Sequence, residues 1–418
     1  MKSWRSELVT PSPPHITMWL AIGSKPARKC CRDLISTYFF RYARDQERQR
    51  RHDVSSMSRC PSCPRGGEPH GDAGARSSPA ADDAGMPLRC APDGLRAGGG
   101  PGVSSGNGAA PREPAMKLCQ FHVPGKGTRV GVVEGDDVLD ITSPKAGAGS
   151  VLALIESCGT AAGIERRARE IARRARTRIP WGELDRPPSP RRAHLLAPLH
   201  PPEVWGAGIT YRRSMQYYEA HTGEHGRTKG IYDYVYESER PELFFKATAS
   251  RTVGPNAPIG VRADSRLTAV EAELAVVVAR DGRIVGYAAA NDVSAWDIER
   301  ENPLFLPQSK VFGGCFAFGP VLATPSEVGD AHGLDLTCRI FRHGRLSFEG
   351  RVNTREMKRR CDDLVGWLRR HNPVPPGTVL STGTGILVPD EHALDEGDVV
   401  EIDLERIGRL RNPVRRLR

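Results

Sequence analysis

The sequence has 418 residues, of which 39% are hydrophobic, and a formal net charge of +10. It is long enough for two or three domains, and it contains no apolar run near the roughly 18 residues that a membrane-spanning helix needs. Residues 1–115 carry 17 Lys and Arg against 11 Asp and Glu. The remainder is therefore only mildly basic, which is weak support for nucleic-acid binding by the folded part.

The first quarter of the sequence has a low-complexity composition. Residues 61–115 contain 21 Gly or Pro among 55 positions, above the roughly 25–30% at which disorder is expected. Such a segment buries too little apolar surface to offset its ordering entropy. We expect residues 1–115 to be a disordered extension, either absent from a native protein that starts at Met116 or dispensable. A basic arm for nucleic acid is the alternative, and it predicts salt-sensitive DNA binding that truncation removes.

Neither a signal peptide nor a disulfide framework is favoured. The apolar stretch ITMWLAIG is short, prolines precede it, and a poor cleavage region follows it. Of the ten cysteines, five lie in the first quarter and the rest are scattered singly. This distribution is typical of reduced, buried thiols in a cytoplasmic protein. The CPSC motif at 60–63 lacks the second pair that a zinc site needs.

A small N-terminal domain is expected over residues 116–198. The apolar runs 128–133 and 138–142 flank EGDD and predict a hairpin. Residues 149–159 and 163–176 have apolar positions at helical spacing. The basic outer face of the second helix is best explained by solvation. Proline-rich text then separates this domain from a larger body.

The body, residues 199–418, reads as many short strands with one clear helix over 354–372. Strands are predicted over 203–210, 242–247, 272–279, 283–290, 315–324, 334–341, 346–353, 378–387 and 398–408. This pattern indicates a mainly antiparallel β domain.

Three carboxylates interrupt the predicted hairpin around Asp281-Gly282. That dipeptide between two apolar runs indicates a two-residue turn, which sets Glu271 opposite Asp292. Glu273 lies on the same face as Glu271 because side chains alternate along a strand. Opposite Cβ atoms are about 5 Å apart and diagonal ones about 7 Å. A turn longer than two residues would remove this register argument.

Unpaired, the three carboxylates would repel one another by roughly 3 kcal/mol per pair. A positive group must therefore lie among them. Oxygen ligands favour a hard cation, Mg²⁺ or alternatively Mn²⁺ or Ca²⁺, over Zn²⁺. Three protein ligands leave positions for a substrate. The alternative is a solvent-facing acidic sheet edge without an ion.

Several motifs together resemble the fumarylacetoacetate hydrolase superfamily over roughly residues 116–418. They are VEAELAVVV, GYAAANDVSAWD, LPQSKVF, STGTGIL and EGDVVEIDLERIGRLRNPV. The segment YDYVYESERPELFFKATASRTVGP and the spacing of 19 residues from Glu273 to Asp292 look most like its 2-keto-3-deoxy-arabinonate dehydratase branch. The resemblance implies an α+β, mainly β fold, namely a mixed β-roll with a small N-terminal α/β domain, in homo-oligomers. It also implies one divalent cation on Glu271, Glu273 and Asp292.

The resemblance implies a metal-dependent lyase that dehydrates a 2-keto-3-deoxy sugar acid through a metal-stabilised enolate. Lys310 and Glu242 then correspond to catalytic residues. Thr384, Gln308 and Arg213 are candidates for substrate binding. The expected partner is a small 2-oxo acid, with neither nucleic acid nor membrane.

Each of these assignments has an ordinary structural alternative. Lys310 and Arg213 would be exposed, Thr384 would be a turn residue, and Glu242 would pair with Arg240 or Lys246. His221 and His225 lie on a polar loop that either closes over the site or is simply solvated.

The runner-up function is a C–C hydrolase or decarboxylase of the same family that acts on an acylpyruvate-like 2-oxo acid. Its relatives carry His-x-x-Glu to activate water, and Ser214 and Tyr217 stand there instead. This absence favours the dehydratase. Trp296 and Arg300 also depart from the family pattern, where Arg and Gly are usual, and they leave the substrate's identity open.

Overall fold

The computed structural model of the chain describes residues 115–222 and 230–418. The expectations for residues 1–114, and for His225 and the side chain of His221, lie outside this described part. No helix within it is long and apolar enough to cross a membrane. Its five cysteines form no disulfide, and four of them are buried.

The N-terminal strands and helices follow the predicted order. The strands are β1 (Lys117–Val123), β2 (Gly127–Glu134), β3 (Asp137–Asp140), β4 (Arg178–Pro180) and β5 (His194–Leu196). The helices are η1 (Pro144–Ala146), α2 (Val151–Cys158), α3 (Ala161–Ala172) and α4 (Trp181–Leu184). Ser150 and Thr160 cap α2 and α3 by accepting hydrogen bonds from backbone N–H groups of the first turn. The predicted hairpin is present as β2 and β3.

The body is rich in strands, as predicted, and has more helices than expected. The strands are β6 (Val204–Gly208), β7 (Glu242–Ala247), β8 (Thr252–Val253), β9 (Ile259–Val261), β10 (Thr268–Ala269), β11 (Ala272–Val278), β12 (Ile284–Asp292), β13 (Ser294–Ala295), β14 (Phe316–Ala323), β15 (Asp335–Arg342), β16 (Arg345–Asn353), β17 (Val379–Ser381), β18 (Val399–Leu404) and β19 (Gly408–Arg416). The helices are α5 (Arg212–Thr222), α6 (Ile231–Glu237), η2 (Ala249–Arg251), α7 (Trp296–Glu301), η3 (Pro303–Phe305), α8 (Leu306–Lys310), α9 (Pro325–Val328), η4 (Thr354–Glu356), α10 (Cys361–Arg369) and η5 (Asp390–His392).

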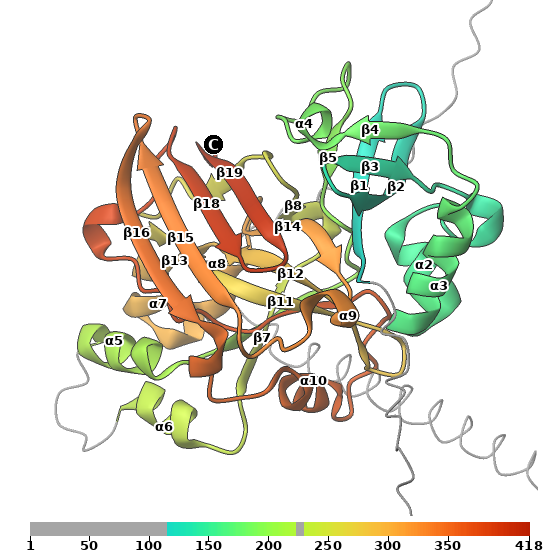
Figure 1. The fold of residues 1–418 in the computed structure, drawn as a ribbon. Helices are drawn as coiled ribbons and strands as arrows, with labels where there is room; N and C mark the ends of the chain where they lie inside the picture. Colours follow the sequence, from blue (N-terminus) through green and yellow to red (C-terminus); the bar gives the residue numbers. More distant parts are fainter. Residues whose placement is uncertain (1–114, 223–229) are drawn as a thin grey trace, which may run out of the picture. The chain divides into compact units, whose positions relative to one another are not determined.

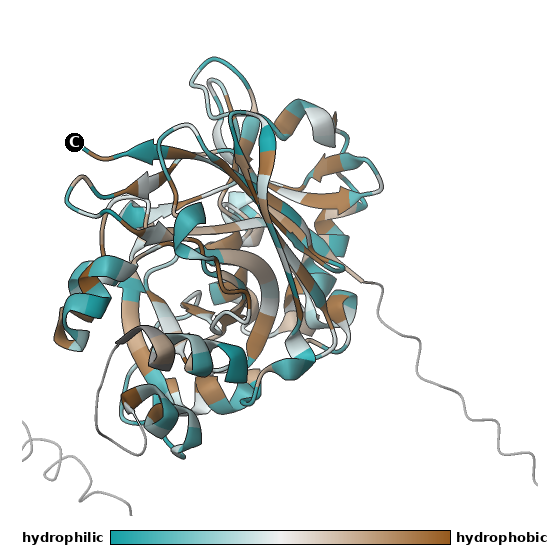
Figure 2. Ribbon diagram, turned by 90° about the vertical axis from the view of Figure 1, so that its left-hand side faces the viewer, coloured by the Kyte–Doolittle hydropathy of each residue, from teal (hydrophilic) through white to brown (hydrophobic). Residues whose placement is uncertain are grey.

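Two large sheets pack face to face. The 12-stranded sheet has the order β4-β3-β2-β1-β14-β12-β11-β17-β6-β7, with β5 also paired to β1 and β8 to β14. The five-stranded sheet has the order β16-β15-β18-β19-β9. In Figure 1, β15, β18 and β19 cross in front of β11, β12 and β14. Figure 2 shows hydrophobic residues concentrated along these strands and hydrophilic ones on the outer helices. The sheet surfaces between the layers therefore form the main core.

The N-terminal strands continue the large sheet. β1 pairs antiparallel with β14, with Lys117 opposite Ala323 and Leu118 opposite Leu322. The expected boundary between residues 116–198 and 199–418 therefore runs through a sheet that both segments share. That boundary stays a prediction.

The central hairpin has the predicted register, but a longer turn and a β-bulge together produce it. Gly282 donates to the carbonyl of Ala279 and has φ of +85°, so the turn has three residues rather than the two predicted. The ladder then shifts between Val277 and Val278. This bulge cancels the shift caused by the longer turn, and Glu273 lies opposite Ala290. Asp292 donates its N–H to the carbonyl of Glu271 at 3.0 Å.

Two predicted elements are shorter than expected. The helix predicted over 354–372 is α10 alone, because η4 and an extended Arg360 precede it. The strand predicted over 378–387 ends at Ser381. Gly383 then leaves the ladder and donates its N–H to the Glu273 carboxylate at 2.8 Å. A side chain of the site thus replaces the strand partner for this backbone group.

Candidate active site

Glu271, Glu273 and Asp292 form one buried cluster. One carboxylate oxygen from each lies within 4.8 Å of the others. Their exposed fractions are 4%, 2% and 1%. Glu271 directly precedes β11, Glu273 lies in it, and Asp292 ends β12. The alternative of a solvent-facing acidic edge is therefore wrong.

Two buried lysines contact this cluster. The Lys310 Nζ lies 2.7 Å from Glu271 and 3.5 Å from Asp292. The Lys246 Nζ lies 2.5 Å from Asp292 and donates to the Val293 carbonyl at 2.8 Å. The two lysines therefore supply positive charge among the carboxylates, in addition to the cation that the sequence predicts. With every group ionised, the five side chains leave one excess negative charge.

The lysines set the protonation of Asp292. Burial acts to raise the pKa of this carboxyl, but Lys246 and Lys310 outweigh burial and hold the pKa below its ordinary value. Burial conversely acts to lower the pKa of Lys310, but Asp292 and Glu271 raise it well above its ordinary value. Asp292 is thus kept as a carboxylate between two ammonium groups.

Among the described residues, no lysine pairs with Glu273. Burial raises its pKa well above the ordinary value, and the charges of Asp292 and Glu271 add to this rise. Ser381 Oγ donates to its carboxylate at 2.5 Å and Gly383 N–H at 2.8 Å. This is the carboxylate that gains most from an added cation, because the other two already have a positive neighbour.

Aromatic donors orient Glu271. The Trp296 Nε1 donates to its carboxylate at 2.6 Å and the Tyr218 hydroxyl at 3.1 Å. Arg300 lies over the Trp296 ring, 5.3 Å from its centroid, and pairs with Asp390 at 2.7 Å. Both residues that depart from the family pattern therefore act on one cluster carboxylate, one directly and one through the indole.

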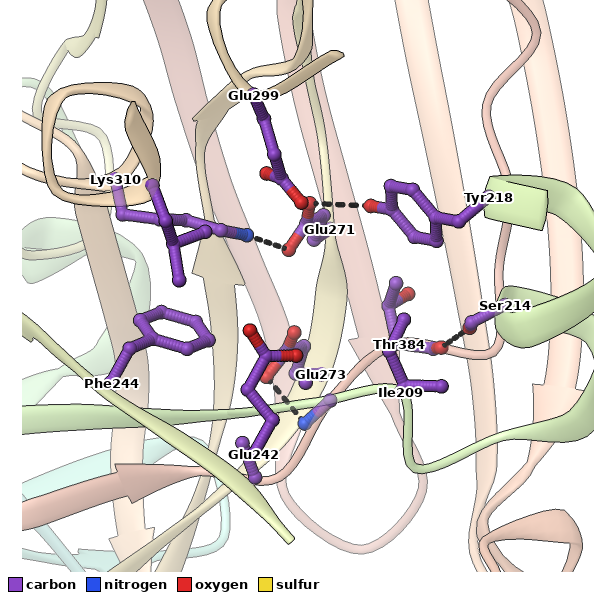
Figure 3. A pocket seen from close by; sticks show the side chains of 14 residues that line it. Ile209, Ser214, Tyr218, Glu242, Phe244, Glu271, Glu273, Glu299, Lys310 and Thr384 are labelled. Atoms are coloured by element: carbon purple, nitrogen blue, oxygen red, sulfur yellow. Dashed lines mark hydrogen bonds and ion pairs between the residues drawn. The ribbon is translucent and has the colours of Figure 1, made fainter. Parts of the chain in front are cut away.

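A cavity of about 360 Å³, counting its open mouth, lies beside the cluster. Its lining is Ala207, Gly208, Ile209, Ser214, Tyr218, Glu242, Phe244, Glu271, Glu273, Glu299, Leu306, Lys310, Gly383 and Thr384. Figure 3 shows Glu242 and Glu299 entering from opposite sides, with Lys310 and Glu271 between them. The charged and polar side chains of this lining suit a small polar ligand.

Glu242 reaches the cavity from β7. The described residues give its carboxylate no hydrogen bond, and its two expected ion-pair partners are engaged elsewhere: Arg240 lies over the Trp367 ring and Lys246 pairs with Asp292. Burial raises its pKa, although the charge of Lys310 opposes the rise. A Cβ on Gly208 would lie 2.0 Å from the Glu242 carboxylate, so only glycine leaves room for it.

Glu299 is a second carboxyl on the same cavity. It lies on α7, is 8% exposed, and contacts Ser309 Oγ at 3.4 Å. Burial raises its pKa to about 7, with Lys310 opposing the rise. A carboxyl with this pKa exchanges protons readily at neutral pH.

Comparison with known proteins assigns the family. Residues 204–415 match the family model "Fumarylacetoacetate (FAA) hydrolase C-terminal". The chain belongs to the fumarylacetoacetate hydrolase family. The mixed, sheet-rich fold expected from the sequence is confirmed by solved structures of this family.

Relatives of this hydrolase-family chain include two dehydratases. It is 48% identical over 224 residues to "2-dehydro-3-deoxy-D-arabinonate dehydratase" of Saccharolobus solfataricus, covering 54% of this chain and 75% of the relative. It is 46% identical over 221 residues to "Probable 2-keto-3-deoxyxylonate dehydratase" of Haloferax volcanii, covering 53% and 75%.

A solved structure, "2-keto-3-deoxy-D-arabinonate dehydratase complexed with magnesium and 2,5-dioxopentanoate", matches with a TM-score of 0.61 and 36% identity. The match covers 72% of this chain and 100% of that one. The expected resemblance to the dehydratase branch of the family is thereby confirmed.

The structure brings together most, but not all, of the predicted site residues of this family member. Lys310, Glu242 and Thr384 line the cavity with two of the cluster carboxylates. Arg213 pairs with Glu356 on the exposed face of α5. The exposed side chain of Gln308 projects from α8 away from the lining. Both residues are exposed on helices, which the strand-based reasoning did not predict.

Thr384 is nearer but already engaged. Its hydroxyl donates to the Ala272 carbonyl at 2.9 Å. The Thr384 hydroxyl oxygen in turn accepts a hydrogen bond from Ile386 N–H at 3.2 Å. Ser214, in place of the family histidine, donates to the Thr384 carbonyl. Both hydroxyls therefore hold the loop that follows β17.

Lys246 and Glu299 were missed. Lys246 follows Glu242 and Phe244 at alternate positions of β7, so strand periodicity could have found it. Glu299 follows Trp296 by three residues, one helical turn, but α7 is too short for a periodic signal.

Proposed function

We propose that this chain is a divalent-metal-dependent hydro-lyase that removes water from a 2-keto-3-deoxy sugar acid of the pentonate type. The observation that carries this proposal is one buried cavity lined by Glu271, Glu273, Lys310 and Glu242, with Asp292 completing the carboxylate cluster. The two dehydratase relatives support the reaction class.

The cluster fits a hard divalent cation. Its three ligand groups are carboxylates, all buried, and they carry one excess negative charge over Lys246 and Lys310. Glu271, Glu273 and Asp292 would hold the ion, and a bound 2-oxo acid would bring the total charge to zero. Magnesium is supported by the complex of the similar dehydratase. When bound, such an ion stabilises the negative charge of an enolate as a Lewis acid.

The side chains around the cavity divide the remaining work. The Lys310 ammonium lies at the cavity surface beside Glu271, where it can hold negative charge on the substrate's keto oxygen. The Glu242 carboxylate has no other partner among the described residues, so it is free to take the C3 proton and return it to the leaving C4 hydroxyl. Phe244 and Leu306 exclude water from the same space.

Hydrolysis of an acylpyruvate-like 2-oxo acid is less well supported. It needs a base for the attacking water, and the cavity lining in the described residues contains no histidine. The expected cytoplasmic location and homo-oligomer stay predictions.

A substrate panel tests the assignment. Purified protein with Mg²⁺ is given 2-keto-3-deoxy-pentonates and acylpyruvates, and products are followed by NMR. We expect loss of water and formation of a semialdehyde from the pentonates. Cleavage of an acylpyruvate into two acids, without dehydration of any pentonate, would overturn the proposal.

The cluster itself is tested by Glu273→Gln. This change removes one anionic ligand. The side-chain amide oxygen can still accept the hydrogen bonds from Ser381 Oγ and Gly383 N–H. We expect divalent-dependent turnover to fall at least about 100-fold, and Mn²⁺ affinity, measured by EPR, to fall about tenfold or more. An unchanged melting temperature in EDTA would show that the fold is kept. Wild-type turnover in this variant would remove the cluster from the mechanism.

A further inference from the structure

The chemistry of the proposed reaction requires more proton transfers than a simple loss of water. The similar dehydratase is complexed with 2,5-dioxopentanoate, which has an aldehyde at C5 where a 2-keto-3-deoxy-pentonate has a primary alcohol. Loss of the C3 proton and the C4 hydroxyl gives water and 5-hydroxy-2-oxopent-3-enoate. This enone has the right atoms, but its C5 is still an alcohol.

Conversion of the enone to the aldehyde is an isomerisation that moves hydrogen. One proton leaves C5, and its electron pair forms the C4=C5 double bond while the keto oxygen becomes an enolate. Water then gives a proton to C3, which yields an enol at C4–C5. The enol loses its O–H proton to water and gains a proton at C4, which gives the aldehyde. Protons and electrons balance with no oxidant, but an acid–base group must reach C5.

Glu242 is needed at the other end of the elimination. Its proposed work is at C3 and at the leaving C4 hydroxyl, and it enters the cavity from β7. Glu299 enters from α7 on the opposite side, with Lys310 and Glu271 between the two carboxyls (Figure 3). Two carboxyls in this arrangement can serve different carbons of one substrate, Glu242 at C3 and Glu299 at C5.

A second cavity shows where the substrate's far end lies. Glu242, Glu299 and Leu306 line both the first cavity and a neighbouring one of about 340 Å³, whose other walls are Ile231, Tyr232, Val235 and Pro303. The two carboxyls therefore stand where the cavities meet. A substrate held by C1 and C2 at the metal cluster can extend towards this junction, so that C4 and C5 lie near the two carboxyls that line both cavities.

We propose that Glu299 is a second catalytic acid–base residue, which removes the C5 proton of the enone and returns a proton to C4. This inference rests on the proposed dehydratase function and adds a residue and a step to it. The long 3.4 Å contact with Ser309 leaves the carboxylate available. The raised pKa of Glu299, about 7, agrees with a group that both takes and gives a proton near neutrality.

The test uses full-length protein loaded with Mg²⁺ and the Glu299→Gln variant. We expect the variant to release the conjugated enone, seen by its near-ultraviolet absorbance and by NMR, while aldehyde formation slows about 100-fold or more. Substrate deuterated at C5 should show an isotope effect on aldehyde formation and none on water loss. Glu301→Gln, on the exposed part of the same helix, is the control and should match wild type.

The possible outcomes distinguish this inference from the proposed function on which it rests. Accumulated enone in Glu299→Gln supports the inference. Aldehyde formed at the wild-type rate, or both steps slowed equally, overturns it, and so does enone accumulation only in Glu242→Gln. If Glu299→Gln fails to fold, Glu299→Asp replaces it, with the same enone expected. Failure of the wild type to dehydrate any pentonate would instead reject the proposed function.

Discussion

At the scale of residues, this site is a balance of buried charges. Three carboxylates lie close together, two buried lysines pair with Glu271 and Asp292, and all five side chains are nearly inaccessible to solvent. Removing either lysine would leave two excess negative charges in a medium of low dielectric, which is costly. The cluster therefore acts as a unit, and it is least balanced at Glu273, where an added cation is most stabilising.

The raised pKa of Glu299 predicts how the stability of the protein depends on pH. Burial raises its pKa to about 7 in the folded protein, whereas the unfolded chain keeps an ordinary value near 4.3. The stability that this residue contributes is therefore complete below about pH 4.3 and is lost as pH rises through 7, by roughly 3 kcal/mol. Glu299→Gln has no such proton. We expect the variant to gain stability relative to wild type between pH 5 and pH 8, measured by urea unfolding in EDTA.

The Glu301→Gln variant is the control for this measurement, because Glu301 lies on the same helix and is exposed to solvent. Its unfolding free energy should run parallel to that of wild type over the whole pH range. A difference between Glu299→Gln and wild type that does not change with pH would contradict the assigned pKa.

How much of the site was predictable also differs between residues. Glu271, Glu273 and Asp292 could be grouped because strand alternation is local and regular. Lys246 follows the same rule on β7 but points at a strand 46 residues away, a pairing that depends on how the strands assemble. Gln308 and Arg213 do not line the cavity in the described residues and stay predictions. Gln308 lies on α8, which has only five residues, too few for the helical period to fix the direction of a side chain.

At the scale of elements, the register of the central hairpin was predicted correctly, but the reasoning behind the prediction was incomplete. The turn is one residue longer than Asp281-Gly282 indicated, and a bulge between Val277 and Val278 compensates for it. The hydrophobic pattern explains this outcome. A one-residue slip would turn the carboxylates away from their shared face and the apolar residues away from the core. The buried faces of β11 and β12 thus determine the register, and the turn adapts to it.

The neighbouring strand β6 supports a second prediction, on Gly208. A methyl group there would meet the end of the Glu242 side chain at 2.0 Å. The carboxyl can swing away at little cost in stability, but it then leaves the cavity. We expect Gly208→Ala to lower kcat about 10–100-fold with a melting temperature close to that of wild type.

Gly366 provides the matched control. It is exposed in the middle of α10, and a methyl group there would contact nothing within 4 Å. Gly366→Ala should raise stability by about 0.5–1 kcal/mol, since alanine favours the helix, and leave kcat unchanged. A Gly208→Ala enzyme with normal kcat would mean that the position of Glu242 is not critical.

At the scale of the whole described chain, the N-terminal strands and the site share one sheet. β1 lies between β2 and β14, and β14 in turn pairs with β12, which carries Asp292. Met116 is 5% exposed, and its carbonyl accepts a hydrogen bond from Thr324 N–H at 2.9 Å. Within the described part of the chain, Met116 is therefore held next to the end of β14.

This arrangement gives a graded prediction for truncation. A chain that starts at Met116 should keep every strand pairing of the large sheet. We expect it to fold with the melting temperature and Mg²⁺-dependent activity of the full chain.

A chain that starts at Lys126 loses β1, and with it the pairings to β2, β5 and β14. Strand β14 would then have an unpaired edge next to the strand that carries a cluster carboxylate, so stability and activity should fall together. Loss of activity already in the Met116 chain would show that residues 1–115 contribute to function, and salt-sensitive DNA binding lost on the same cut would support the nucleic-acid arm instead.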